Sequence, residues 1–493
     1  MKRPNILVLM ADQLTGTLFP DGPADWLHVP HLRALAGRAR RFARCYTASP
    51  LCAPARASIM TGLLPSRTGV YDNADEFASA LPTFAHVLRR AGYATTLAGK
   101  MHFVGPDQLH GFEERLTTDI YPADFGWTPD WSRPGERVDW WYHNLGSVTG
   151  AGTAEITNQL EYDDEVAHLG AQKLYDLARR HDPRPWCLTV SFSHPHDPFL
   201  ARRRHWDLYA GSSYLAPEVG ALTADEHDPH SRRLLDACDW RACGIMPEQV
   251  ALAHRGYFAS SSYRDEKIGE LLATLKAARF EEDTMILFTA DHGEMLGERG
   301  LWFKMSFREG SARVPLLLAG PGIAEGCAEH PVSTLDIAPT LAALAGVRMP
   351  EGDGENLMAA ARGPVPMEYA AEGAVAPMVA LVEDCWKYVA CPADPPQLFD
   401  LASDRHEMTN CAGLSRGTAA QMSAAIAARW DLDAFDGAVR ASQARRHLGY
   451  EALRGGAYYP WDFQPLRAAS ERYMRNHKDL NVLEDAQRFP RGA

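Results

Sequence analysis

Short apolar runs alternate with longer amphipathic stretches along most of the chain. Asn5 to Met10 is almost continuously apolar, as a strand buried on both faces should be, and Cys187 to Phe192 and Thr284 to Thr289 have the same character. Helical spacing of apolar residues appears in three stretches: Leu32, Leu35, Ala36 and Ala39 within residues 31–42; Val166, Leu169, Leu174 and Leu177; and Ile268, Leu271, Leu272 and Leu275. This alternation predicts an α/β fold, in which helices sandwich a large, mostly parallel or mixed central sheet.

Two parts of the chain depart from this alternation. Residues 105–160 are rich in Gly, Pro, Trp and Tyr, which predicts a long excursion from the core of the kind that binds ligands. After about residue 375 the pattern changes again. We therefore expect a main α/β domain at 1–374, a small α+β subdomain at 375–440 and an extended tail at 441–493.

The small subdomain has predicted elements of its own. Met378 to Val382 and Trp386 to Ala390 have the composition of strands, and Thr418 to Trp430 predicts a covering helix with Thr418 as its N-cap. The tail that follows is rich in aromatic residues. We expect it to dock on the protein's own body or on a neighbouring subunit.

Composition and charge narrow the classes of function. The 493 residues carry 50 Lys and Arg against 63 Asp and Glu, a formal net charge of −13, which argues against nucleic-acid or anionic-membrane binding but allows a local basic pocket. Hydrophobic residues make up 46% of the chain and charged residues 23%, as in ordinary globular proteins. Nine cysteines lack zinc spacing, and the apolar runs are too short for a secretory or membrane segment. We expect a cytoplasmic protein.

One segment, from Pro50 to Gly62, brings a thiol and a guanidinium together. Cys52 follows Pro50-Leu51, and Arg56 lies four residues later in a run with helical character. A thiol at a helix N-terminus beside a guanidinium ionises more readily and is a candidate nucleophile. The alternative is a cysteine that only packs in the core.

Polar residues follow two of the predicted strands. Asp12-Gln13 comes directly after the first strand, and Asp291-His292 comes after the strand that ends near Ala290. Ligands of open α/β sheets collect at the carboxyl ends of strands, so the two pairs are expected to converge. Two carboxylates, an amide oxygen and an imidazole would hold a divalent cation, with Ca²⁺ or another oxygen-preferring ion expected. Each aspartate on its own could instead cap the end of its strand.

The order Cys-x-Pro-x-Arg, followed by an apolar pair, Thr and Gly, resembles the signature of the sulfatase family. The resemblance implies an alkaline phosphatase-like fold. It also implies that a separate formylglycine-generating enzyme oxidises Cys52 to formylglycine (3-oxoalanine), whose hydrate is the nucleophile and contacts the metal. Arg56 would bear part of the charge on the sulfate oxygens.

Further residues gain roles from the same resemblance. Lys100, in Gly99-Lys100-Met101-His102, would hold sulfate oxygens, and His102 would deprotonate the diol after sulfate transfer. His196, in a Pro-His-x-Pro element, and Lys304 would stand beside the leaving oxygen, while Asn73 would support the metal site or the sulfate. Such a concentration of positive groups suits a dianionic transition state, and a departing alkoxide needs a general acid. Taken singly, each is more often a satisfied or solvated side chain.

The metal motifs depart from the commonest family pattern. Many sulfatases have Asp-Asp at the first pair and Asp-Asn at the second, whereas this chain has Gln13 and His292. It is similar in this to the branch that contains choline sulfatases and phosphonate monoester hydrolases. Imidazole admits manganese more readily than an all-oxygen cage, so Mn²⁺ and Mg²⁺ are alternatives to Ca²⁺.

Three segments resemble choline sulfatases specifically: residues 12–22, residues 372–377 and the tail from Gly449 to Arg488. In those enzymes an aromatic residue, here Trp127, stacks on the trimethylammonium group, as aromatic faces do for such cations. The resemblance also implies His143, Glu372 and Asp485 at the choline end, with Asp485 reaching a neighbouring subunit in a homo-oligomer (dimer or tetramer). The remaining rings of the excursion are expected to pack the insertion.

The resulting hypothesis is a metal-dependent hydrolase that converts choline O-sulfate to choline and sulfate, in osmoprotectant metabolism. A first alternative is a phosphonate monoester or phosphodiester hydrolase with the same nucleophile and metal, because the core motifs do not separate the two. A second is a non-catalytic osmolyte-binding protein, which would keep an unmodified Cys52. Neither nucleic acid nor a membrane is expected as a partner.

Overall fold

The computed structural model describes residues 3–122, 124–133, 145–179, 182–238, 240, 244–359 and 363–455. His143 and Asp485, both predicted at the choline end, lie outside the described residues, as does most of the predicted tail.

A mixed central sheet forms the core of the molecule. Within the described residues it has eight strands in the order β12-β2-β11-β9-β1-β7-β4-β5. Their bounds are β1 Asn5–Ala11, β2 Arg40–Phe42, β4 Ala94–Gly99, β5 Glu114–Arg115, β7 Trp186–Phe192, β9 Thr284–Ala290, β11 Leu316–Ala319 and β12 Gly326–Ala328. Strand β11 runs antiparallel to both of its neighbours, whereas β9, β1, β7, β4 and β5 are parallel.

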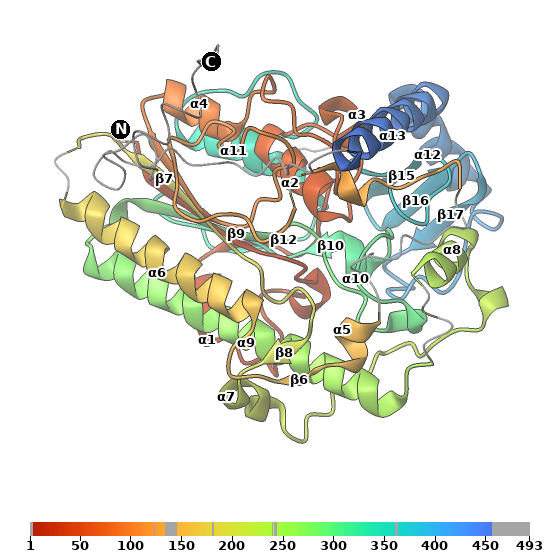
Figure 1. Cartoon of the computed structure of the whole chain (residues 1–493), viewed down its shortest axis with the longest axis horizontal. Coiled ribbons are helices and arrows are strands. Elements are labelled where there is room, and N and C mark those ends of the chain that lie inside the picture. Colours follow the sequence, from red (N-terminus) through yellow and green to blue (C-terminus); the bar gives the residue numbers. More distant parts are fainter. Residues whose placement is uncertain are drawn as a thin grey trace, which may run out of the picture.

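Helices cover both faces of this sheet (Figure 1). On one face α6 (Asn158–Arg179) and α9 (Pro247–Ala277) lie side by side, with α1 (Pro30–Ala36) against α9. On the other face are α2 (Cys52–Thr61), α4 (Phe84–Arg90) and α11 (Ile337–Leu344). The predicted α/β sandwich is confirmed, and β1, β7 and β9 are buried because helices cover both of their faces.

Strand register aligns the two predicted metal-binding pairs. Ala11, the last residue of β1, is paired with Ala290, the last residue of β9. Asp12 and Asp291 therefore leave neighbouring parallel strands at the same edge of the sheet. The two pairs therefore converge at the carboxyl ends of neighbouring strands, where ligands of open α/β sheets are expected to bind.

A second, antiparallel sheet follows the main domain. Its order is β14 (Val365–Tyr369), β15 (Met378–Glu383), β16 (Trp386–Cys391) and β17 (Asp394–Asp400), and helix α12 (Arg416–Arg429) packs on β15 and β16. The last described helix is α13 (Leu432–Arg454). The remaining elements are β3 Cys45–Tyr46, β6 Gly152–Thr153, β8 Leu200–Ala201, β10 Arg313–Val314, β13 Val332–Ser333, α3 Pro65–Thr68, α5 Gly146–Thr149, α7 Arg203–Trp206, α8 Pro229–Ala237 and α10 Glu309–Ala312, with short 3₁₀ turns between them.

Two local predictions are wrong. Helix α1 ends at Ala36, and residues 40–42 form β2 instead, because their backbone groups pair with β11 and β12. Helix α12 begins before Thr418: Ser415 occupies the N-cap position, and the Ala419 N–H already donates to its carbonyl at 3.0 Å. Gly417 lies in the first turn, where its low helix propensity does not prevent the helix from starting.

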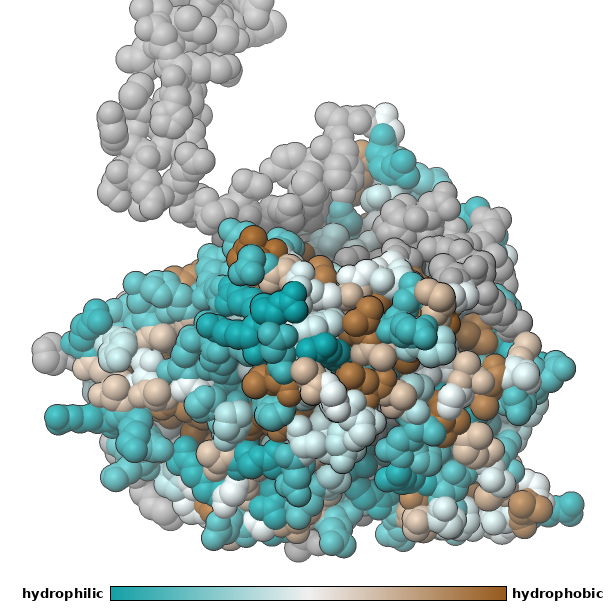
Figure 2. Space-filling view, turned by 90° about the horizontal axis from the view of Figure 1, so that it is seen from below, coloured by the Kyte–Doolittle hydropathy of each residue, from teal (hydrophilic) through white to brown (hydrophobic). Residues whose placement is uncertain are grey.

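The outer surface mixes polar and apolar side chains. On the face shown in Figure 2, hydrophilic residues are interspersed with small groups of hydrophobic ones. Among the helices that the structure describes, none combines the length and apolar character needed to cross a bilayer.

Candidate active site

Cys52 is the first residue of helix α2. Leu51 occupies the N-cap position with extended backbone and offers no side-chain cap. Instead, Asn73 Oδ1 accepts a hydrogen bond from the backbone N–H of Ala53 at 2.9 Å, which satisfies one of the open donors of the first turn. The predicted placement of a thiol at a helix N-terminus is confirmed, and Asn73 supports that end of the helix.

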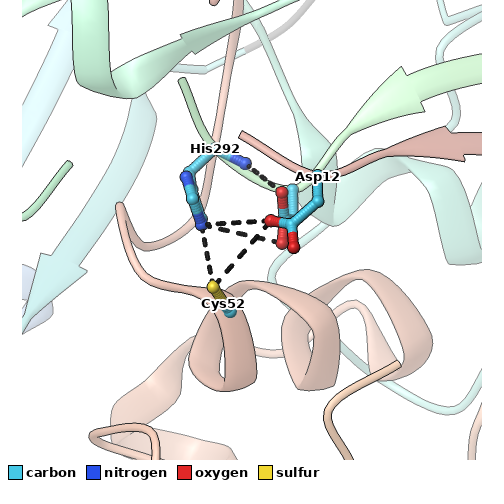
Figure 3. A group of neighbouring side chains, drawn as sticks. Asp12, Cys52 and His292 are labelled. Atoms are coloured by element: carbon cyan, nitrogen blue, oxygen red, sulfur yellow. Dashed lines mark hydrogen bonds and ion pairs between the residues drawn. The ribbon is translucent and has the colours of Figure 1, made fainter. Parts of the chain in front are cut away.

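Four side chains, one of them that of Cys52, could hold a metal ion. Asp12, Cys52, Asp291 and His292 each offer a ligand atom, all of these atoms lie within 4.8 Å of one another, and all four residues are buried. Figure 3 shows Asp12 and His292 reaching the start of α2 from the ends of neighbouring strands. Cys52 Sγ lies 3.1 Å from His292 Nε2 and 3.9 Å from Asp12 Oδ1.

The protonation state of His292 suits metal ligation. Its Nδ1 lies 3.0 Å from the Gly293 carbonyl and donates to it, which leaves Nε2 with a lone pair directed at the cluster. Burial lowers the pKa of His292 to about 4, although Asp291 opposes this, so the imidazole is neutral. A neutral imidazole between two carboxylates is a donor set that fits a divalent ion.

Two buried cations balance the carboxylates. Arg56 Nε donates to Asp291 Oδ2 at 2.8 Å, and Lys100 Nζ donates to Asp12 and lies 3.6 Å from Cys52 Sγ. Burial alone would raise the pKa of Asp12, but Lys100 and Arg56 hold it well below its ordinary value. Both cations are completely buried and offset the charge of the two carboxylates, so a divalent ion held by these residues would make the surroundings of Cys52 favourable for an anion.

Gln13 is held beside the cluster by its own contacts. Its backbone N–H donates to Asp291 Oδ1 at 3.1 Å. The side-chain amide donates to Asp197 and Glu294, and its Oε1 accepts from Lys304 Nζ. The predicted amide ligand therefore lies next to the metal residues, with its oxygen engaged by Lys304.

His196 and Lys304 form a directly bonded pair. Lys304 Nζ lies 2.8 Å from His196 Nε2. Since an ammonium group only donates, Nε2 is the acceptor, and Nδ1 donates to the Asp197 carbonyl at 2.8 Å. The two residues assigned to the leaving oxygen are thus brought together.

His102 lies on a turn that Asp119 fixes. Asp119 Oδ2 accepts from the backbone N–H groups of Met101 and His102 at 3.0 and 2.8 Å and from Arg115 at 2.8 Å. The turn begins at Gly99, where a Cβ would lie 1.9 Å from the Ser191 carbonyl oxygen, so only glycine fits. Neither ring nitrogen of His102 has a hydrogen-bond partner among the described residues, although the ring is buried.

Tyr121 links the parts of the site. Lys100 Nζ lies 4.0 Å from the centre of its ring, its hydroxyl lies 3.2 Å from His196 Nδ1, and its ring lies 5.4 Å from that of His102. Trp127 stands beside both, 5.7 Å from Tyr121 and 5.9 Å from His102 between ring centres. Trp127 is half-buried and therefore lies at the partly exposed side of the candidate site.

Glu372 is a buried carboxyl near the same site. Its Oε2 accepts from the Tyr369 hydroxyl at 3.2 Å, whereas its Oε1 has no hydrogen-bond partner among the described residues. Burial raises the pKa of Glu372 to about 8, and the charge of Asp72 adds to the effect. It is the one residue predicted at the choline end, apart from Trp127, that the structure describes.

Sequence reasoning missed Tyr121, Asp119 and Glu294. The sequence shows Tyr121 only as one of the aromatic residues of the excursion. Its contacts with Lys100, His196 and His102 depend on how the loop folds back onto the site. Asp119 and Glu294 act through backbone and amide contacts that leave no motif in the sequence. The nearness of Glu294 to His292, two residues away, is the one sequence feature that could have pointed to it.

Two family models match the chain. The one described as Sulfatase matches residues 4–347. A second, described as Choline sulfatase enzyme C terminal, matches residues 437–489.

Individual relatives agree with these matches. A choline-sulfatase from Rhizobium meliloti (strain 1021) is 63% identical, and the alignment covers 99% of each chain. An uncharacterized sulfatase from Escherichia coli (strain K12) is 28% identical over 83% of each. The solved structure of a phosphonate monoester hydrolase of Agrobacterium radiobacter superimposes with a TM-score of 0.67, covering 92% of this chain and 96% of that one at 23% identity. At this identity the likeness supports the fold alone.

Proposed function

The chain belongs to the sulfatase family, and from this premise we propose that it hydrolyses choline O-sulfate to choline and sulfate. The observation that carries the proposal is the 63% identity to a choline-sulfatase along essentially the whole of both chains. The geometry agrees with it, because Cys52 begins a helix, faces three metal-ligand side chains and is flanked by two buried cations.

Asp12, Asp291 and His292 would hold the divalent ion, with Gln13 beside them. When bound, the ion would draw negative charge from the sulfate oxygens, and a formylglycine formed from Cys52 would supply the nucleophile. The residues fit both groups: the donor atoms converge, His292 is neutral, and Lys100 and Arg56 flank Cys52. We propose Ca²⁺ first, because most of the donor atoms are oxygens. Mn²⁺ and Mg²⁺ are alternatives, since carboxylates suit all three ions and the imidazole of His292 admits manganese.

The chain's own residues divide the remaining work. Lys100 and Arg56, fixed by Asp12 and Asp291, hold charge next to the place where sulfate oxygens would lie. The His196–Lys304 pair holds a proton that can pass to the departing alkoxide. His102, whose ring nitrogens have no hydrogen-bond partner in the part of the chain that the structure describes, is available to take a proton afterwards.

Trp127 would recognise the trimethylammonium group, and its replacement separates that role from simple packing. Trp127→Ala is expected to raise KM for choline sulfate by about 30-fold, which corresponds to a desolvated cation–π contact of about 2 kcal/mol. Trp127→Phe keeps an aromatic face and serves as the matched variant. KM for an uncharged alkyl sulfate is measured in parallel. An equal loss with both substrates would dismiss the aromatic contact.

The function itself is tested by comparing two substrates with purified protein matured by a formylglycine-generating enzyme. We expect kcat/KM for choline sulfate to exceed that for a phenyl phosphonate monoester. A strong preference for the phosphonate would replace the proposal with the phosphonate hydrolase alternative. Tight binding of choline sulfate without turnover, with Cys52 still unmodified after exposure to the formylglycine-generating enzyme, would favour the osmolyte-binding alternative.

Assembly and location extend the proposal. We propose a homo-oligomer, a dimer or tetramer, in which the tail with Asp485 reaches a neighbouring subunit, and a cytoplasmic site of action. The match of residues 437–489 to a choline sulfatase C-terminal family supports a role for this part of the chain in choline recognition.

A further inference from the structure

Helix α13 presents a polar stripe to the main domain. Its buried residues are Phe435, Val439, Ser442, Gln443 and Arg446, which share one face at helical spacing. Ser442, Gln443 and Arg446 are each less than 10% exposed, at 7%, 4% and 5%. A helix that only packed on the domain would bury apolar residues along this face, so the polar half of the stripe points to specific bonding.

Arg446 forms ion pairs with the loop that carries Asn73. Its guanidinium donates to both oxygens of Asp72 at 2.7 Å, and its Nε lies 2.8 Å from Asp75 Oδ1. Ser442 Oγ also donates to Asp75 Oδ1 at 2.7 Å. Asn73, between the two aspartates, receives the Ala53 N–H beside Cys52. The guanidinium therefore fixes the loop whose Asn73 side chain accepts a hydrogen bond from the first turn of α2.

The same guanidinium is hydrogen-bonded to the loop that carries Trp127. Arg446 Nη1 donates to Thr128 Oγ1 at 2.9 Å, and Thr128 Oγ1 in turn donates to the Phe125 carbonyl at 2.8 Å. Thr128 is buried and directly follows Trp127. One side chain therefore joins the loop of Asn73 to the loop of Trp127.

Neighbouring residues of α13 reinforce the second loop. Gln443 Oε1 accepts from the Trp131 N–H at 3.0 Å, and Trp131 Nε1 donates to the Ala371 carbonyl at 3.1 Å, next to Glu372. Figure 1 shows α13 on the same side of the molecule as α2 and α3. The family match that begins at residue 437 covers most of this helix.

We propose that Arg446 is a positioning residue that holds the Asn73 loop and the Trp127 loop in one fixed relation across the substrate pocket. The inference rests on the proposed function, because it assigns the first loop to the sulfate end and the second to the choline end. Arginine suits the task, since its planar fork binds a carboxylate with two parallel bonds while a further N–H reaches Thr128. Lysine would keep the charge but lose the fork.

The test compares four variants of the full-length, matured protein. Arg446→Met removes the guanidinium, and Arg446→Lys keeps only its charge. Thr128→Val removes the hydroxyl that accepts from Arg446 and donates to the Phe125 carbonyl, while the bonds of Arg446 to Asp72 and Asp75 remain. Arg445→Met is the matched control, because Arg445 is the neighbouring residue on α13 but is exposed. For each we measure kcat and KM with choline sulfate and with an uncharged aryl sulfate, together with the thermal melting curve and the modified fraction of Cys52.

Arg446→Met is expected to lower kcat/KM for choline sulfate by about 100-fold, the scale of a misplacement of about 1 Å. Its KM for choline sulfate should rise more than its KM for the aryl sulfate, with partial recovery in Arg446→Lys. Thr128→Val should raise KM for choline sulfate alone, which keeps the test decisive if Arg446→Met melts early. Arg445→Met should stay within about twofold of the parent.

The inference is overturned if Arg446→Met and Thr128→Val both leave the ratio of kcat/KM for the two substrates at the parent value. It is also overturned if Arg446→Lys is as impaired as Arg446→Met and the loss in both follows the folded fraction alone. Failure of the parent itself to turn over choline sulfate would instead contradict the proposed function, and with it the choline-end half of the inference.

Discussion

At the scale of single residues, the candidate site is a buried cluster in which two carboxylates, two cations and a neutral imidazole surround Cys52. The ends of neighbouring strands predicted that Asp12 and His292 lie together, whereas Lys100 was expected only from the resemblance to sulfatases. Residues such as Asp119, which act by accepting backbone N–H groups from another loop, could not be predicted. Their role depends on a spatial contact that no sequence pattern encodes.

Glu372 makes a prediction about pH. Its pKa of about 8 means that the carboxyl is largely neutral at pH 7 and ionised at pH 9; Tyr369, Asp72 and Lys304 are the groups that act on it. If Glu372 faces the ammonium group, kcat/KM for choline sulfate relative to an uncharged alkyl sulfate should rise about tenfold from pH 7 to 9, as the ionised fraction does.

The matched variant for this pH profile is Glu372→Gln, which stays neutral throughout. It is expected to flatten the ratio of the two substrates across the range. A ratio that is flat in the parent, or that still rises in Glu372→Gln, would show that Glu372 does not meet the cation.

At the scale of elements, packing between segments corrects what local patterns predict. The helical spacing of residues 31–42 was misleading beyond Ala36, because β2 pairs with strands that lie far away in the sequence. The buried strands β1, β7 and β9 were predictable from apolar runs alone, since burial on both faces leaves an unbroken hydrophobic record.

A buried ion cluster joins the small sheet to the loop of Lys304. Lys387 on β16 donates to Glu309 at 2.6 Å, to Glu407 at 3.0 Å and to the Phe307 carbonyl at 2.8 Å, and it is completely buried. Lys387→Met leaves the buried Glu407 carboxylate without this cation, whereas Glu309 keeps its ion pair with Arg313. The free energy of unfolding, measured with denaturant, should fall by about 3–5 kcal/mol.

The matched control is Arg203→Met, which removes an exposed ion pair with Asp207. Its effect on unfolding should be below about 1 kcal/mol. Comparable small effects in both variants would mean that the Lys387 cluster does not stabilise the contact between sheet and domain.

At the scale of the whole molecule, the C-terminal part distinguishes this chain from sulfatases in general. The Sulfatase family match ends at residue 347, whereas the choline sulfatase C-terminal match covers 437–489. Helix α13 ties the start of this region to the pocket through Arg446. The sequence predicted a specialised tail, but not that its first helix bonds to two active-site loops.

Truncation after Gly455 tests the remainder of this region, because it leaves α13 intact. If the tail completes a neighbour's pocket, the shortened protein should lose its assembly in light scattering and show a raised KM for choline sulfate. Turnover of an uncharged aryl sulfate should be retained. A monomeric truncation with full activity toward choline sulfate would end the idea.

The central claim, hydrolysis through a nucleophile made from Cys52, is tested most directly by the mass of the peptide that contains this residue. We predict that protein active on choline sulfate carries an aldehyde or its hydrate in place of the thiol, and that Cys52→Ala is inactive. An active preparation in which this peptide retains an unmodified cysteine would contradict the account.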